Sequence, residues 1–100
     1  MAVISVTTLT VGASWDQFLE SQKKSKAIME KHGAKNVRLL APVAGAEPSG
    51  TMHQTFEADD MASLGKVTDA LFADPEILAM MQDGSAASWT TSISGEIPLD

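Results

Sequence analysis

The residue best suited to proton transfer in this chain is His53, in the middle of the β-strand expected over residues 51 to 58. An imidazole titrates close to neutral pH, so it can act as a general acid or base. The neighbouring Gln54 offers an amide that can hold a polar group of a ligand. His53 and Gln54 are therefore the candidate catalytic residues. The alternative is a hydrogen-bonded structural histidine, which strand alternation favours because it turns His53 away from the face of Met52 and Phe56.

Large apolar side chains recur in the predicted helices and strands and could line a pocket for an apolar ligand. The candidate ligand-binding residues are Trp15, Phe18, Met52, Phe56 and Trp89. A domain of 100 residues needs the same side chains to fill its core, so core packing is the default interpretation. Both interpretations hold in part if the pocket lies between a helix layer and a sheet.

The sequence contains neither a metal-binding motif nor an activated nucleophile. Cysteine is absent, which removes disulfides and thiolate ligands, and two histidines supply too few nitrogen ligands for a closed zinc site. His32 ends a predicted helix, where it is most simply a partner of the helix dipole. The acidic group Glu57, Asp59 and Asp60 lacks the spacing of a calcium loop and is explained by helix capping. We therefore expect no metal and no organic cofactor.

The composition argues against nucleic acid and membranes as partners. Seven basic and thirteen acidic side chains give a net charge of −6, so phosphate backbones and anionic lipid surfaces repel the chain on average. No apolar run approaches the roughly 18 residues of a spanning helix, and the first residues lack the basic region of a signal peptide. We expect a cytoplasmic protein that forms one domain over residues 1–100.

Hydrophobic periodicity predicts the order strand, helix, strand, strand, helix, strand. Ser14 is expected to cap the first helix, whose apolar stripe includes the polar Gln22, and Gly33 to end it. Asp59 or Asp60 should cap the second helix, which breaks or kinks at Pro75 and closes at Gly84. The predicted elements are a strand over 2–11, a helix over 15–32, strands over 36–44 and 51–58, a helix from 61 to 84, and a strand over 87–97.

The segment GAEPSG sets the expected pairing of the second and third strands. If its first and last glycines flank the turn, Arg38 lies opposite Glu57 and Leu39 lies opposite Phe56. A charge pair and an apolar pair then fall on opposite faces, as an antiparallel register requires. Pro42 cannot donate a ladder hydrogen bond, so the second strand is expected at an edge of the sheet.

This element order predicts an α+β protein. A ferredoxin-like βαββαβ chain forms a four-stranded antiparallel sheet with two helices on one face and with the first and third strands in the centre. The helices cover only one face, yet the first strand is apolar on both. An identical sheet from a second copy is the most economical cover, so we expect a homodimer.

With these features the chain resembles the dimeric α+β-barrel superfamily, which includes small antibiotic-biosynthesis monooxygenases, NIPSNAP-like proteins and stress-responsive barrel domains. The resemblance covers nearly the whole chain and is carried by the element order, by KHGAKNVRLL at the end of the first helix and by ADPEILAMM in the second. It implies a dimeric α+β barrel in which each subunit keeps a pocket between its helices and its sheet.

The resemblance also implies a function: a small, mostly apolar ligand, bound by a cofactor-independent monooxygenase or by a cyclase- or isomerase-type enzyme. The alternative is a non-enzymatic, stress-related or scaffolding dimer, and the sequence leaves open whether the protein is an enzyme. Haem degradation is disfavoured, because haem-degrading members rely on an asparagine early in the fold and on a tryptophan and a histidine of the second helix. Here the one asparagine is Asn36, and residues 60 to 83 contain neither Trp nor His.

Overall fold

Strands and helices follow one another in the predicted order. The computed structural model describes residues 2–12, 14–45, 47, 49–82 and 86–99. In this part of the chain the elements are β1 (Val3–Val11), α1 (Trp15–Lys31), β2 (Lys35–Leu40), β3 (Thr51–Ala58), α2 (Met61–Ala73), α3 (Pro75–Gln82) and β4 (Ala86–Gly95). The predicted break at Pro75 separates α2 from α3. The Asp74 carboxylate starts α3 by accepting the backbone N–H groups of Glu76 at 2.9 Å and Ile77 at 3.2 Å.

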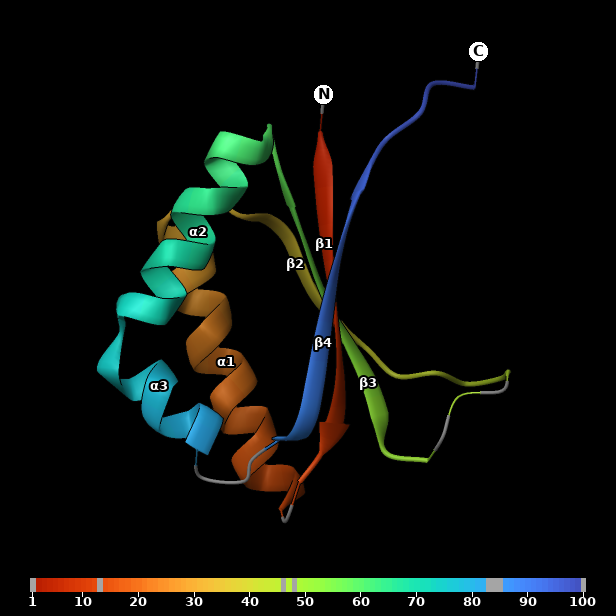
Figure 1. Ribbon diagram of the computed structural model, residues 1–100. Coiled ribbons are helices and arrows are strands. Elements are labelled where there is room, and N and C mark those ends of the chain that lie inside the picture. Colours follow the sequence, from red (N-terminus) through yellow and green to blue (C-terminus); the bar gives the residue numbers. More distant parts are fainter. Residues whose placement is uncertain (1, 13, 46, 48, 83–85, 100) are drawn as a thin grey trace.

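The four strands form one antiparallel sheet in the order β2-β3-β1-β4, so β1 and β3 are central, as predicted. The helices lie together on one face of this sheet (Figure 1). The predicted fold class is therefore confirmed: a ferredoxin-like α+β fold, with the second helix divided into α2 and α3.

The core lies between the helices and the central strands. Phe18 of α1 and Val67 of α2 have no exposed surface (0%). Val3, Met29 and Phe56 are buried in one cluster with Val67. Burying side chains of this size is the main favourable term that holds the helices on the sheet.

The face of the sheet opposite the helices is called the open face below. It carries the even-numbered side chains of β1, among them Ile4 and Val6, which are half-buried. The odd-numbered side chains Val3 and Leu9 are buried on the helix side. The prediction that β1 is apolar on both faces is thus confirmed.

The predicted pairing of β2 with β3 is wrong by two residues. Arg38 lies opposite Thr55 and Leu39 opposite Gln54. A further register shift between Lys35 and Arg38 then brings Lys35 opposite Glu57. The strand ends at Leu40 rather than at residue 44, because Pro42 has no N–H to donate and restricts the residue before it. The connection to β3 is therefore longer than the predicted turn. A slip of two residues leaves Arg38 and Leu39 on their predicted faces.

The ends of α1 follow the predicted signals. The Ser14 hydroxyl accepts the backbone N–H of Gln17 at 3.3 Å, and Gly33 adopts a φ of +102° just after the helix, a conformation that favours glycine. Asp60, and not Asp59, is the N-cap of α2. The predicted helix end at Gly84 lies outside the described residues. No helix in the described part of the chain is long and apolar enough to cross a membrane.

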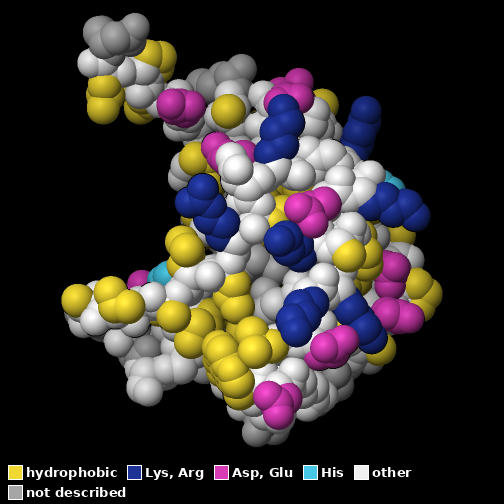
Figure 2. Space-filling model, turned by 180° about the vertical axis from the view of Figure 1, so that it is seen from behind, with side chains coloured by type: hydrophobic (Ala, Val, Ile, Leu, Met, Phe, Trp, Pro, Cys, Tyr) yellow, Lys and Arg dark blue, Asp and Glu magenta, His cyan; other side chains and the backbone are white. Residues whose placement is uncertain are grey.

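Two arms extend from the sheet on the side away from the helices (Figures 1 and 2). One is the connection between β2 and β3, which exposes Val43 almost completely (99%). The other is the chain after β4, which exposes Ile97 and Leu99. Both arms therefore offer apolar side chains beyond the open face.

Candidate functional site

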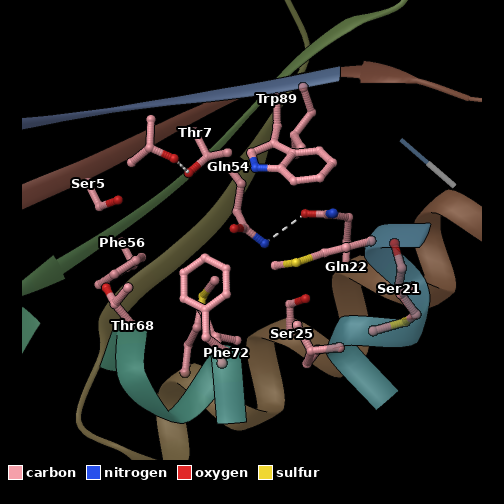
Figure 3. A pocket seen from close by; sticks show the side chains of 17 residues that line it. Ser5, Thr7, Ser21, Gln22, Ser25, Gln54, Phe56, Thr68, Phe72 and Trp89 are labelled. Carbon is pink, nitrogen blue, oxygen red and sulfur yellow. Dashed lines mark hydrogen bonds between the residues drawn. The ribbon is translucent and has the colours of Figure 1, made fainter. Parts of the chain in front are cut away.

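A pocket of about 160 Å³ lies between the helix layer and the sheet (Figure 3). Its walls come from β1, β3 and β4 on one side and from α1, α2 and α3 on the other. Phe72 and Trp89 are about half exposed, so the pocket opens to solvent beside them. Side chains from six elements can thus touch one bound molecule.

The walls of the pocket are mostly apolar. Trp89 of β4 lies on the sheet side and Phe72 of α2 on the helix side (Figure 3). Phe56 and the thioether side chains of Met80 and Met81 complete this part of the lining. Aromatic faces give large contact areas, and flexible methionines adapt to the shape of a ligand. The pocket therefore suits a molecule with a flat, apolar body.

Two amides supply the central polar groups. The Gln54 Nε2 atom of β3 donates a hydrogen bond to the Gln22 Oε1 atom of α1 at 2.7 Å (Figure 3). Gln54 is only 8% exposed. This bond uses one donor and one acceptor, and each amide has further hydrogen-bonding capacity. The pair can therefore hold a carbonyl or hydroxyl oxygen of a ligand at the middle of the pocket.

The hydroxyl groups of the lining are directed largely at the protein itself. Ser21 donates to the carbonyl oxygen of Phe18 at 2.7 Å, and Thr68 donates to that of Leu64 at 3.1 Å. Such bonds along a helix satisfy the hydroxyl within its own turn. Gln22 and Gln54 are therefore the lining side chains best placed to bind a polar group of a ligand.

The residues that line this pocket include no Asp, Glu, Lys, Arg or His in the described part of the chain. An ionised ligand would lose its hydration here without gaining a counter-charge, which is strongly unfavourable. The lining also contains no side chain that can take up a proton near neutral pH. The pocket can bind, orient and hydrogen-bond a molecule, but proton transfer would have to involve the molecule itself or water.

A second hollow of about 240 Å³ lies between α1 and β2 and shares Gln22 and Gln54 with the pocket. Apolar Leu19, Val37 and Leu39 also line it. The amide pair therefore borders space on two sides. A break in the Gln22–Gln54 hydrogen bond would alter both hollows together.

The two candidate catalytic residues point to opposite sides of the sheet. Gln54 lines the pocket, whereas His53 lies on the open face, as strand alternation predicted. The His53 Nδ1 atom is 3.1 Å from the Thr8 hydroxyl, and its Nε2 atom is 3.0 Å from a carboxylate oxygen of Glu47. This placement is that of the hydrogen-bonded histidine of the alternative interpretation. A catalytic role of His53 stays a prediction, and it would have to be exerted outside the pocket.

Of the five candidate ligand-binding residues, two line the pocket and three do not. Phe56 and Trp89 line the pocket. Phe18 is fully buried in the core, and Trp15 stacks on it with ring centroids 5.8 Å apart. Met52 is half-buried and, like Trp15 and Phe18, is not among the lining residues.

Four lining residues were not among the candidate residues chosen from the sequence. Gln22, Phe72, Met80 and Met81 come from the three helices. The signal for Gln22 was available, because a polar side chain within an apolar helical stripe is either a core hydrogen-bonding partner or a binding group. Phe72, Met80 and Met81 have the spacing of core residues. Apolar spacing does not distinguish a side chain that lines a pocket from one that is packed in the core.

The acidic group Glu57, Asp59 and Asp60 at the end of β3 has structural partners. The ammonium of Lys35 donates to Asp59 at 2.7 Å, and this bond raises the pKa of Lys35. The backbone N–H of Ser63 donates to Asp60 at 2.8 Å and lowers the pKa of that carboxyl. Glu57 lies opposite Lys35 in the sheet. Among the described residues, no three His, Asp or Glu side chains lie together as metal ligands would.

Solved structures with the same architecture place this geometry among known folds. SnoaB from Streptomyces nogalater, a cofactor-independent oxygenase, matches with a TM-score of 0.72 at 14% identity, over 98% of this chain and 96% of its own. The chain shares the fold of that protein. A putative antibiotic biosynthesis monooxygenase from Caulobacter crescentus matches with a TM-score of 0.74 at 18% identity, over 97% of this chain and 91% of its own.

The likeness extends to proteins of other kinds. A NIPSNAP-like domain protein from Burkholderia xenovorans matches with a TM-score of 0.72 at 10% identity, over 99% of this chain and 88% of its own. No protein-family model matches the sequence, and no curated protein matches it. These structural neighbours agree with the superfamily that the sequence resembles, and at such identities they show the fold alone.

Proposed function

We propose that this protein binds a neutral, mostly apolar small molecule in the pocket between its helices and its sheet. The observation that carries the proposal is the Gln22–Gln54 amide pair, which lies in an apolar pocket where none of the described lining side chains is ionisable. Few polar groups in an apolar cavity are what small-molecule sites typically contain. The amides would orient the ligand through an oxygen atom.

The size of the pocket is consistent with this ligand class. An apolar cavity of roughly 150 Å³ is known to hold one benzene ring, and this pocket has about 160 Å³ and an open mouth. The inner part therefore accepts one ring, and a fused second ring would extend between Phe72 and Trp89. An anion would pay a desolvation penalty that the net charge of −6 increases.

Cofactor-independent oxygenation is the candidate activity. It is supported by the fold shared with SnoaB, a cofactor-independent oxygenase. An amide can hydrogen-bond a carbonyl or phenolate oxygen but cannot take up a proton. A substrate of such a reaction would therefore enter in its neutral form and give its proton to water, and the amide pair would hydrogen-bond the oxygen atom that is left charged. A cyclase or isomerase would meet the same requirement, and dioxygen uptake during turnover distinguishes the oxygenase from both.

A homodimer that buries the open faces is the proposed assembly. Ile4, Val6 and Leu40 lie on this face, and the last of them is 47% exposed. The two arms that carry Val43 and Leu99 extend past the same face, so a second copy could cover their apolar side chains. If the protein is a scaffolding dimer without a substrate, this surface and not the pocket carries its function.

A thermal-shift comparison tests the binding proposal. The uncharged 1-naphthol should raise the melting temperature of the protein at concentrations where the 1-naphthoate anion does not, because a ligand that binds the folded state stabilises it. Gln54→Leu should lose most of this shift, and the exposed control Gln17→Leu should keep it. Equal shifts with both compounds, or a shift that Gln54→Leu leaves unchanged, would contradict the proposal.

A further inference from the structure

The second hollow, between α1 and β2, differs from the pocket in its chemistry. Part of its lining is aliphatic: Leu19 of α1 and Val37 and Leu39 of β2 are all half-buried and still present apolar surface. Basic side chains also border it, whereas its lining in the described part of the chain contains no Asp or Glu. An aliphatic surface beside positive charge suits a molecule that carries an anionic group on an apolar chain.

Positive charge is concentrated at this hollow. Three of the seven basic residues of the chain border it, Lys23, Lys26 and Arg38, although the whole chain has a net charge of −6. Among the described residues none of these three forms an ion pair with a carboxylate, whereas the adjacent Lys24 lies 3.5 Å from Glu76. Their charge is therefore available to a ligand.

The two lysines lie on one face of α1. The residues of this helix that line the hollow are Leu19, Gln22, Lys23 and Lys26. Their spacing of three, one and three residues places them in a single stripe. Side chains three residues apart have Cβ atoms about 5 to 6 Å from each other, so both ammonium groups can reach one anion. Like charges so close destabilise a helix, and a bound anion removes that repulsion.

We propose that this hollow binds a soluble phosphate monoester whose short aliphatic chain lies against the aliphatic part of the lining. Lys23 and Lys26 hold the phosphate, and Arg38 adds a third positive charge from the edge strand β2. A phosphate monoester carries nearly two negative charges at neutral pH and has three acceptor oxygens, so it can accept from both lysines together. A carboxylate such as 1-naphthoate offers a single charge, and one ion pair between exposed groups contributes little.

The size and the remaining polar groups of the hollow agree with this ligand. A cavity of roughly 150 Å³ holds one benzene ring, so the volume of about 240 Å³ accepts a chain of several carbons. The Gln22 Oε1 atom is engaged by Gln54, which leaves the Gln22 amide N–H groups able to donate to a phosphate oxygen. The site takes a charged ligand where the pocket takes a neutral one, so this inference does not rest on the proposed function.

Titration of ¹⁵N-labelled protein with hexyl phosphate tests the site directly. The backbone amide signals of residues 19–26 and 37–39 should shift saturably, because these segments border the hollow. Inorganic phosphate should bind at least tenfold more weakly, since each methylene group that leaves water adds roughly fourfold to the affinity. Hexanol, which has the chain without the charge, should bind at least fivefold more weakly than hexyl phosphate.

A pair of double variants separates local charge from total charge. Lys23→Gln combined with Lys26→Gln should weaken the binding of hexyl phosphate at least fivefold. Lys31→Gln combined with Lys66→Gln is the matched control, because it changes the net charge equally at exposed positions that do not line the hollow. This control should change the affinity less than twofold. All four positions are exposed, so both proteins should fold.

Three results would overturn the proposal. They are an absence of saturable shifts in these segments, equal affinity for hexyl phosphate and inorganic phosphate, and an equal loss of affinity in the two double variants. Phosphatidic acid presents the same phosphate group on a lipid. Co-sedimentation with vesicles containing it, if abolished by the Lys23 and Lys26 substitutions, would replace the soluble ligand by a membrane surface and also overturn the proposal. The same variant should keep the response of the Trp89 indole signal to 1-naphthol, so failure of this site and failure of the pocket are distinguishable.

Discussion

Gln54 and Gln22 should contribute to stability as a coupled pair, so that losing one side chain costs more than losing the second. Gln54→Leu leaves the Gln22 Oε1 atom without its 2.7 Å donor in a part-buried setting. Leaving a polar group unsatisfied in this way costs about 1 to 3 kcal/mol. Gln22→Leu leaves the Gln54 Nε2 atom without its acceptor, and Gln54 is only 8% exposed. Each single substitution should therefore lower the free energy of unfolding by about 1.5 kcal/mol.

The double variant with leucine at both positions removes both partners together. Replacing both ends of a buried hydrogen bond by apolar groups can be nearly neutral, so the double variant should lose at least about 1 kcal/mol less than the sum of the single losses. Urea unfolding followed by far-UV circular dichroism, at one fixed protein concentration, gives the three values. Gln17→Leu on the exposed first turn of α1 is the control and should change stability by less than about 0.5 kcal/mol.

If the loss of unfolding free energy in the double variant equals the sum of the two single losses within about 0.3 kcal/mol, the reasoning is refuted, because independent sites are additive. The pair would then not be the coupled polar centre of the pocket. A double variant that is as stable as the natural protein but binds no neutral ligand would support the account fully. It would show that this bond is kept for binding and not for folding.

Phe18→Ala should destabilise the protein by about 3 to 5 kcal/mol in urea unfolding, since its ring is fully buried, whereas Phe72→Ala at the pocket mouth should cost much less and weaken ligand binding instead. Asp60→Asn tests the N-cap by its pH dependence. The N–H of Ser63 holds the pKa of Asp60 below its usual 3.8, so the carboxylate stabilises the fold above that pH. This contribution is lost as the pH falls through the lower pKa of the folded state. The free energy of unfolding should therefore fall less steeply with decreasing pH in the variant than in the natural protein. Val6→Lys on the open face should shift the sedimentation equilibrium to monomer at micromolar concentration, and an unchanged dimer would place the interface elsewhere.

The fold could be predicted from the sequence because its signals are local and consistent. Alternation marked the strands, and capping residues such as Ser14 and Gly33 marked the ends of α1. The hairpin register could not be predicted by the same means. It depends on where β2 stops. The strand stops at Leu40, two residues before Pro42, and does not continue through this proline as an edge strand.

The site was predictable only in part, for a physical reason. Strand alternation separated His53 from Gln54 correctly, because a period of two fixes the face of each side chain. Apolar spacing found the aromatic residues but could not tell buried Phe18 from the exposed wall residue Phe72. That difference depends on how closely the helices approach the sheet, and no local pattern encodes that distance.

The most direct test of the central claim uses Trp89 as a reporter at the pocket wall. The chain has two tryptophans, so Trp15→Phe leaves the Trp89 indole as the single indole signal in a ¹⁵N–¹H spectrum. Titration with neutral 1-naphthol should shift this signal saturably, and the added substitution Gln54→Leu should weaken the apparent affinity by at least tenfold. The 1-naphthoate anion should shift it little over the same concentrations. An indole signal that does not respond to the neutral compound, or that responds equally to the anion, would contradict the assignment of this pocket as a site for a neutral apolar ligand.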